Sequence, residues 1–254
     1  MKLRRLGCGL LALILSLLLA VPVASYANSF SDVNGHWAEF YISKVYNAHI
    51  IEGYPNGRFQ PDKAVTRAEF IAMVNKAYDL DHLDGEETVG YSDIVYTSWY
   101  YDDVSVAIAL GYAAGYSDGT FRPNSPITRQ EAAVMLSNLM PAAKKGGNLK
   151  SFSDVKQLDS TASEAFSKLI GKGYISGYSD KKLHPADPVT RAQAAKILSD
   201  ILDNEDIVTR KTIVDEDGTE LTAKTYVGDV LIDEDLEDGS ATIDNCVILG
   251  DLLV

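Results

Sequence analysis

The sequence predicts a mainly α-helical protein of three helix-turn-helix repeats, followed by a short β-solenoid-like C-terminal segment. Two observations lead to this prediction. A Thr-Arg-x-Glu/Gln tetrapeptide occurs three times, and its arginines (Arg67, Arg129 and Arg191) are 62 residues apart in both steps. Near the C-terminus, a short apolar run with a Gly-Asp corner recurs after 22 residues. A fixed period indicates one structural unit used repeatedly, so a site built by that unit should also recur.

Residues 1–27 have the composition of an export signal. A basic start leads into an apolar run over 10–23, and the small residues Ser25 and Ala27 offer a cleavage site. An uncleaved N-terminal anchor is the alternative. No later segment is long and apolar enough to cross a bilayer, so we expect no integral membrane span after cleavage. Cys246 would then be the only cysteine, which excludes an intramolecular disulfide.

The chain is acidic, with a formal net charge of −13. Residues 201–254 carry 15 acidic and 3 basic residues, so most of the excess lies at the C-terminal end. Neither part has the basic surface that nucleic acid or anionic lipid requires, so we expect no nucleic acid partner. The four histidines lack metal-ligand spacing. Asp233, Asp235 and Glu237 resemble a calcium loop with a misplaced glycine, but solvated acidic corners are the favoured explanation, so we expect neither metal nor cofactor.

Each repeat has the same order of local signals. It opens with an aromatic-Ser-Asp-aliphatic turn, whose aspartate can cap nearby backbone. A helical pattern follows, with Ile42, Val45, Tyr46 and His49 on one face in the first copy. A Gly-Tyr turn and a short extended piece ending in proline come next. The tetrapeptide then starts a second helix, with Thr as N-cap and Glu or Gln at the third position in a capping box.

The arginine of the tetrapeptide stands at the first helical position, where a cation is disfavoured by about a few tenths of a kcal/mol. Two explanations are open. Helix-start N–H groups together with a guanidinium would make a receptor for carboxylate or phosphate. Alternatively, each arginine pairs with the aspartate of its own repeat and holds the unit together.

Over residues 30–200 this order of motifs resembles three consecutive S-layer homology (SLH) domains. The resemblance implies a pseudo-threefold arrangement around a central helix bundle. It also implies non-covalent anchoring to secondary cell-wall polysaccharides, often pyruvylated, and hence export to the cell wall, S-layer or cell surface. The carboxylate of a pyruvate ketal agrees with an anion-binding role for the arginine.

The resemblance also implies inter-repeat grooves that bind the glycan. Trp37 and Trp99 would stack on sugar rings, although filling the core of the unit is an equal alternative. Copy three departs from the pattern, with Thr161 at the tryptophan position, Lys181 for the second turn glycine and Gln193 for glutamate, so we expect its groove to be weaker. By copy, the expected glycan-binding residues are Asp32, Trp37, Gly53, Tyr54 and Arg67; Asp93, Trp99, Gly115, Tyr116 and Arg129; and Asp154, Gly177, Tyr178 and Arg191.

The C-terminal end changes character. Residues 204–224 are polar and acidic and suggest a linker, whereas 225–254 resemble the opening coils of a right-handed parallel β-helix. Two coils cannot bury a stable core, so we expect a truncated reading frame, a fragment or assembly with another chain through the terminal β segment. The predicted divisions are a signal (1–27), three repeats (28–85, 86–147 and 148–203), the linker (204–224) and the β-solenoid-like segment (225–254).

Enzyme signals are weak. Gly115-Tyr116-Ser117-Asp118-Gly119 matches the G-x-S-x-G pattern, but a nucleophile elbow needs a strand before it and a helix directly after it. The leading hypothesis is therefore a non-catalytic anchor that binds anionic cell-wall glycan. The alternative is the N-terminal part of a surface polysaccharide-degrading enzyme or adhesin whose β-helix domain lies beyond this sequence.

Overall fold

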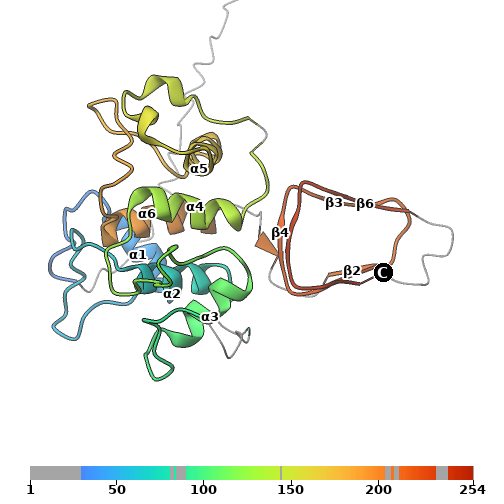
Figure 1. Ribbon diagram of the computed structural model, residues 1–254, viewed down its shortest axis with the longest axis horizontal. Coiled ribbons are helices and arrows are strands. Elements are labelled where there is room, and N and C mark those ends of the chain that lie inside the picture. Colours follow the sequence, from blue (N-terminus) through green and yellow to red (C-terminus); the bar gives the residue numbers. More distant parts are fainter. Residues whose placement is uncertain are drawn as a thin grey trace, which may run out of the picture.

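The computed structural model describes residues 30–80, 83, 90–143, 145–203, 207–208, 212–232 and 240–253. They form a helical part and a part made of short strands (Figure 1). The expected export signal over 1–27 and the acidic residues Asp233, Asp235 and Glu237 lie outside the described residues.

Six α-helices form the first part, two from each repeat. The first helix of each repeat packs against the second helix of the preceding repeat: α3 on α2 and α5 on α4, while α1 packs on α6. The first repeat is thereby joined to the third. The helices are α1 (Glu39–Asn47), α2 (Arg67–Ala77), α3 (Tyr101–Ala109), α4 (Arg129–Asn138), α5 (Ser160–Lys172) and α6 (Arg191–Leu202), with 3-10 turns η1 (Leu149–Ser151) and η2 (Val155–Gln157) before α5.

The predicted capping boxes are confirmed at the starts of α2, α4 and α6. Each threonine hydroxyl accepts a hydrogen bond from the third helical N–H, and the Glu or Gln side chain accepts one from the threonine N–H. Two otherwise unpaired donors are satisfied at each start, so four consecutive residues define each start.

Three extended residues before these helices bond to one another in a closed cycle. Val65 N–H donates to Val189 O, Ile127 N–H to Val65 O and Val189 N–H to Ile127 O, each at 2.9 Å. Three isolated bridges accompany them, Ala64 with Thr190, Thr66 with Pro126 and Thr128 with Pro188. All three cycle residues are fully buried. Within this cycle, each repeat therefore donates one backbone hydrogen bond to another repeat, and these bonds join all three.

A single core runs through the helical part. Phe59, Phe121 and Leu183, from equivalent positions in the three repeats, are all fully buried in it. On the predicted face of the first helix, Ile42 and Val45 are buried and Tyr46 is partly buried against the core, whereas His49 is exposed. Helix α1 ends at Asn47, and His49 has a left-handed φ of 58° just beyond it. Equivalent positions hold Gly111 and Gly173, so His49 occupies a helix-terminating position that favours glycine.

Among the described residues, the strands pair with one another only in parallel, and each strand pairs with the equivalent strand of a neighbouring turn of the chain. The sheet orders are β1-β4-β7, β2-β5-β8 and β3-β6. The predicted 22-residue repeat is confirmed by pairs such as Val227 with Leu249 and Val230 with Leu252. The strands are β1 (Ile207–Val208), β2 (Thr212–Val214), β3 (Thr219–Thr222), β4 (Thr225–Val227), β5 (Val230–Ile232), β6 (Ala241–Asp244), β7 (Val247–Leu249) and β8 (Leu252–Leu253).

The expectation of a linker over 204–224 was wrong for its described residues, because β1, β2 and β3 lie there. Their acidic residues occupy corners and exposed strand positions, while Val214 and Leu221 are buried. The polar composition of this segment did not indicate strands, because only one side of each short strand faces inward and the other side is polar.

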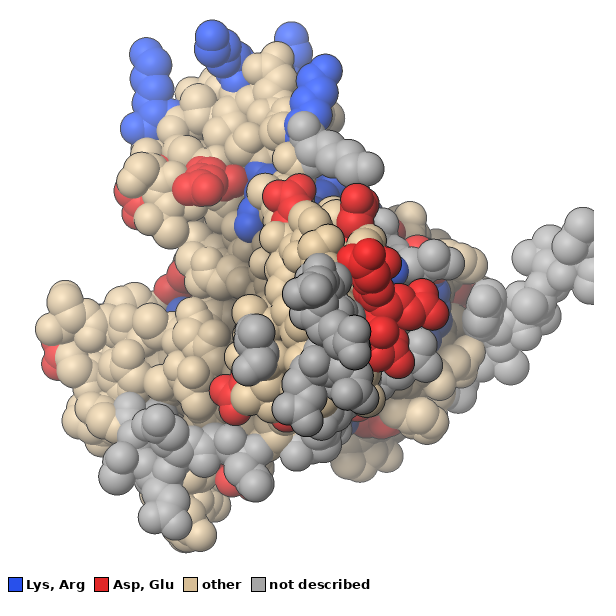
Figure 2. Space-filling model, turned by 90° about the vertical axis from the view of Figure 1, so that its right-hand side faces the viewer, with Lys and Arg blue, Asp and Glu red and all other residues tan. Residues whose placement is uncertain are grey.

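The strand-containing part is attached to the end of α4. Thr225 Oγ1 donates to Leu139 O at 2.7 Å, and Asn245 exchanges two hydrogen bonds with the backbone of Ala142. Val227 and Leu249 belong to the same core as the helices. Figure 2 shows the face of the molecule that lies on the right in Figure 1, where the strands are. Acidic side chains gather near the middle of this face, and Lys and Arg side chains stand at its upper end, the end at which Figure 1 places α5. No described helix has the length and apolar character needed to cross a membrane.

Candidate functional site

Each tetrapeptide arginine lies over the turn tyrosine of the next repeat in the cycle. The guanidinium carbon is 5.0 Å from the ring centroid for Arg67 and Tyr116, and 4.7 Å for Arg129 and Tyr178. The third pair, Arg191 and Tyr54, closes the cycle at 4.8 Å. The expectation that each groove combines the arginine and tyrosine of one copy was therefore wrong.

The arginines are almost fully buried and bind main-chain carbonyls of that next repeat. Arg129 Nε donates to Leu183 O at 2.8 Å and its Nη2 to Ser176 O at 3.1 Å. Only 6% of Arg129 is exposed. The equivalent acceptors are Phe121 O and Ala114 O for Arg67, and Phe59 O and Glu52 O for Arg191. The guanidinium groups thus hold neighbouring repeats together.

The helix-start N–H groups expected to receive an anion are already bonded. Arg129 N–H donates to Asp187 O, and Gln130 N–H donates to Pro185 O, both at 2.9 Å. The next N–H donates to the threonine cap. The same pattern occurs at Arg67 and Arg191. Because these donors are occupied, an anion would have to bind the guanidinium edge and not the helix terminus.

The opening aspartates bond to backbone and do not pair with the arginines. Asp32 accepts hydrogen bonds from Phe59 N–H at 2.9 Å and Gln60 N–H at 2.8 Å. Burial opposes its ionised form, but these donors outweigh it and lower its pKa. Asp93 binds Phe121 and Arg122 in the same way, and Asp154 binds Leu183 and His184. The second residue of each pair has a positive φ, so the carboxylates stabilise strained backbone.

The first glycine of each turn has a packing reason. A Cβ at Gly53 would lie 2.0 Å from Phe30 Cε1, and one at Gly177 would lie 2.1 Å from Phe152 Cε1. Gly115 meets Tyr91 at 2.3 Å in the same way. The opening aromatic therefore requires glycine at this position.

The two tryptophans do not fill the core. Trp37 is 59% exposed and Trp99 is 64% exposed, each just before the first helix of its repeat. Large aromatic side chains left this exposed are typical of surfaces that bind a ligand or partner.

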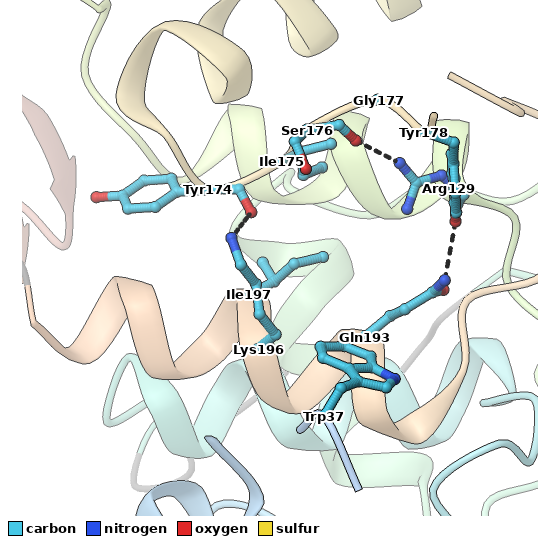
Figure 3. A pocket seen from close by; sticks show the side chains of 10 residues that line it. All are labelled: Trp37, Arg129, Tyr174, Ile175, Ser176, Gly177, Tyr178, Gln193, Lys196 and Ile197. Atoms are coloured by element: carbon cyan, nitrogen blue, oxygen red, sulfur yellow. Dashed lines mark hydrogen bonds between the residues drawn. The ribbon is translucent and has the colours of Figure 1, made fainter. Parts of the chain in front are cut away.

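One cavity of about 210 Å³ brings residues of all three repeats together (Figure 3). Trp37 comes from the first repeat and Arg129 from the second. The third repeat supplies the turn tyrosine and one face of α6. We call this the Arg129 groove; it is lined by Trp37, Arg129, Tyr174, Ile175, Ser176, Gly177, Tyr178, Gln193, Lys196 and Ile197.

The acidic partner of each arginine differs between repeats. Arg67 Nη1 lies 3.2 Å from Glu131 Oε1. Burial opposes ionisation of Glu131, but hydrogen bonds from Tyr116 and Thr128 and the charge of Arg67 lower its pKa. Burial lowers the pKa of Arg191 and of Arg129. Tyr54, Glu69 and Asp32 oppose this effect for Arg191, and Tyr178, Asp187 and Asp154 oppose it for Arg129. The residue beside Arg129 that corresponds to Glu69 is the neutral Gln193, which donates to Tyr178 Oη at 2.8 Å.

Two of the three departures of copy three line different hollows, whereas Lys181 lines neither of them. Gln193 lies in the Arg129 groove, whereas Thr161 lies in a separate hollow between α4 and α5, with Val134 and Lys168. Sequence reasoning missed Lys196 as a lining residue. The spacing could have shown it, because Gln193 and Lys196 are three residues apart on one helix and share a face.

The Ser117 turn does not have the geometry of a nucleophile elbow. The residues before it form no strand, and helix α4 begins only at Arg129. Within the described ranges, no three potential metal-ligating side chains cluster.

The S-layer homology domain family model matches residues 29–71, 90–133 and 151–195. The chain is similar to the "Surface-layer 125 kDa protein" of Lysinibacillus sphaericus, with 29% identity over 77% of this chain and 16% of the relative. It also resembles an "Amylopullulanase" of Thermoanaerobacterium thermosulfurigenes (31% identity, 70% of this chain, 10% of the relative). A "Cellulosome-anchoring protein" of Acetivibrio thermocellus is 32% identical over 50% of this chain and 29% of that protein. The chain thus spans less than a third of each.

Proposed function

Because the chain belongs to the S-layer homology (SLH) domain family, we propose that its three repeats anchor the protein by binding an anionic, pyruvylated secondary cell-wall polysaccharide. SLH domains are non-catalytic anchoring modules that bind cell-wall polymers, and the relatives include a surface-layer protein and a cellulosome-anchoring protein. The protein accordingly belongs at the cell wall or cell surface. The observation that carries the proposal is the Arg129 groove, where an exposed tryptophan faces a buried cation.

We propose a pseudo-threefold arrangement for the repeats. The closed cycle of hydrogen bonds through Val65, Ile127 and Val189 supports it, as do the equivalent arginine contacts. In this arrangement the Arg129 groove has two counterparts. One combines Arg67 with the Gly115-Tyr116 turn and Thr161, and the other combines Arg191 with the Gly53-Tyr54 turn and Trp99.

The binding mode follows from the fixed position of each guanidinium. Two of its donors are held by carbonyls, so the group is oriented before a ligand arrives and little side-chain entropy is lost on binding. A sugar ring stacked on Trp37 would direct a carboxylate towards the remaining edge of Arg129. Asp32, Asp93 and Asp154, with Gly53, Gly115 and Gly177, support the grooves by holding the turns.

We further propose that residues 1–27 direct secretion and that the parallel strands are the first coils of a β-helix. The parallel pairing at 22-residue intervals supports the β-helix. Leu252 and Leu253 in β8 are 47% and 42% exposed, which supports their contact with further coils or with another chain.

A second candidate is the cell-wall-binding part of a surface polysaccharide-degrading enzyme. The similarity to an amylopullulanase over 70% of this chain favours it. Sequencing the coding region downstream of Val254 discriminates between the two. Additional coils with clustered acidic residues would favour an enzyme.

Co-sedimentation with purified cell walls tests the anchor. Walls from the source organism are compared before and after hydrofluoric acid extraction of secondary polymers. Trp37→Ala together with Trp99→Ala should abolish sedimentation with intact walls, because both rings are exposed and their loss leaves the core unchanged. Phe40→Ala is the matched control, since Phe40 is 54% exposed on α1 but does not line the groove. Equal sedimentation of the double variant and the unaltered protein would refute the groove's role.

A further inference from the structure

We propose that the Arg129 groove binds an anionic ligand more strongly than the Arg67 groove, because Gln193 stands where Glu131 forms an ion pair with Arg67. This inference rests on the proposed function and identifies one specificity-determining residue. It reverses the expectation that copy three, having lost its glutamate, would form the weaker groove.

The charge beside each arginine decides the comparison. Glu131 forms an ion pair with Arg67 at 3.2 Å, so a ligand carboxylate would compete with a carboxylate already in place. Arg191 does not share this ion pair: Glu69 and Asp32 raise the pKa of its guanidinium against the effect of burial, as Asp187 and Asp154 do for Arg129, so the contrast is with Arg67. Gln193 occupies the same helical position in α6 and has no charge. Its amide instead bonds to the Tyr178 hydroxyl.

Arg129 has one terminal nitrogen to offer a ligand. Its Nε and Nη2 are held by Leu183 O and Ser176 O, and Nη1 has no hydrogen-bond partner within the described part of the chain. The corresponding Nη1 of Arg67 is the atom that faces Glu131. Other carboxylates near Arg129 are occupied, since Asp154 binds backbone N–H groups and Asp187 faces His184. The Arg129 groove therefore lacks the direct carboxylate ion pair that Arg67 forms with Glu131.

Lys196 distinguishes this groove further. The equivalent positions of the other repeats hold Ala72 and Val134, so neither has a cation there. Lys196 Nζ lies 2.6 Å from Asp200 and donates to Tyr174 O at 3.2 Å. Asp200 offsets the charge of Lys196, whereas no carboxylate among the described residues lies within ion-pair distance of Arg129. Figure 3 shows both basic side chains among the residues around the same cavity.

The remaining walls define the rest of the ligand. Trp37 offers an aromatic face, and Ile175 and Ile197 are apolar. A cavity of about 210 Å³ has room for one substituted sugar ring. The groove thus fits a monosaccharide unit that carries one carboxylate on an otherwise apolar edge, such as a pyruvate ketal.

Gln193→Glu tests the inference with little change in shape. Glutamate is the residue at this position in the other two capping boxes, so α6 should start normally. Isothermal titration of the full chain uses two probes, a methyl hexosaminide with a pyruvate ketal and the same glycoside with an isopropylidene ketal, which lacks the carboxylate. We expect Gln193→Glu to weaken binding of the first at least tenfold, about 1.4 kcal/mol, and to leave the second within twofold.

Gln130→Glu is the matched control, because it adds the same charge next to Arg129 in sequence but outside the groove. It should leave both affinities within twofold. If unaltered protein binds cell walls and Gln193→Glu binds the pyruvyl probe equally well, the inference is overturned while the anchor stands. If unaltered protein binds neither cell walls nor the pyruvyl probe, the proposed function fails. If Gln193→Glu and Gln130→Glu weaken binding of the pyruvyl probe equally, the cause is general charge repulsion, and this result also overturns the inference.

Discussion

Arg67→Ala should strongly destabilise the helical part, in contrast to the loss of binding alone that an exposed receptor would give. Arg67 is 2% exposed and donates to Phe121 O and Ala114 O, both at 2.9 Å. Alanine leaves these carbonyls without their charged donor and Glu131 without its cation. Hydrogen bonds to charged groups contribute about 1.5–3 kcal/mol each. Breaking a buried ion pair costs about 3–5 kcal/mol.

These contributions overlap, so we expect a net loss of about 3–5 kcal/mol from the free energy of unfolding. That is a large fraction of the roughly 5–15 kcal/mol typical of folded proteins. Urea unfolding followed by circular dichroism at 222 nm measures it. Arg58→Ala, at an exposed arginine of the same repeat, should change the unfolding free energy by less than about 0.5 kcal/mol. A loss below about 1 kcal/mol for Arg67→Ala, with cell-wall binding abolished, would refute this reasoning and restore the receptor interpretation.

Two further predictions concern backbone strain and acidity. Lys181 has a left-handed φ of 58°, and the equivalent positions of the other repeats hold Gly57 and Gly119. Because glycine adopts this backbone without strain, Lys181→Gly should raise the free energy of unfolding by about 0.5–1 kcal/mol. A lower melting temperature of the variant would contradict this. The folded-state pKa values of Asp32 and Asp154 lie below their ordinary 3.8, because backbone N–H donors outweigh burial. Their contribution to stability is therefore complete above pH 3.8 and is lost as the pH falls through their folded-state pKa values. In an acid titration, the free energy of unfolding of Asp32→Asn should therefore fall less steeply with decreasing pH than that of the unaltered chain.

Local motifs were predictable and contacts between repeats were not. The capping boxes depend on four consecutive residues, so Thr66 and Glu69 could be assigned from the sequence, and the structure confirms them. The end of α1 could not, because the spacing of His49 continues the helical pattern while its left-handed backbone terminates it. Periodicity reports which face a residue would occupy in a helix and does not report where the helix ends.

The grouping of site residues failed for a different reason. Equivalent residues were assigned to grooves by copy, but Arg129, Tyr178 and Trp37 come from three different repeats. The sequence contains no signal for which repeat a guanidinium contacts, since all three copies have the same pattern. Exposure of Trp37 and Trp99 was likewise undetermined, because an aromatic before a helix can face either way.

The packing of α1 on α6 has a consequence for the order in which the protein folds. The first helix finds its partner only after about 150 further residues, so this contact is formed at a high cost in loop closure. While only the first two repeats are present, the apolar face of α1 has no helix to pack against. The carbonyls of Phe59 and Glu52 also lack the hydrogen bonds that Arg191 later donates. A chain that crosses a membrane N-terminus first would therefore stay incompletely folded until its third repeat emerges. An incompletely folded chain passes through a narrow channel more easily, and the module could bind its ligand only after all three repeats have crossed.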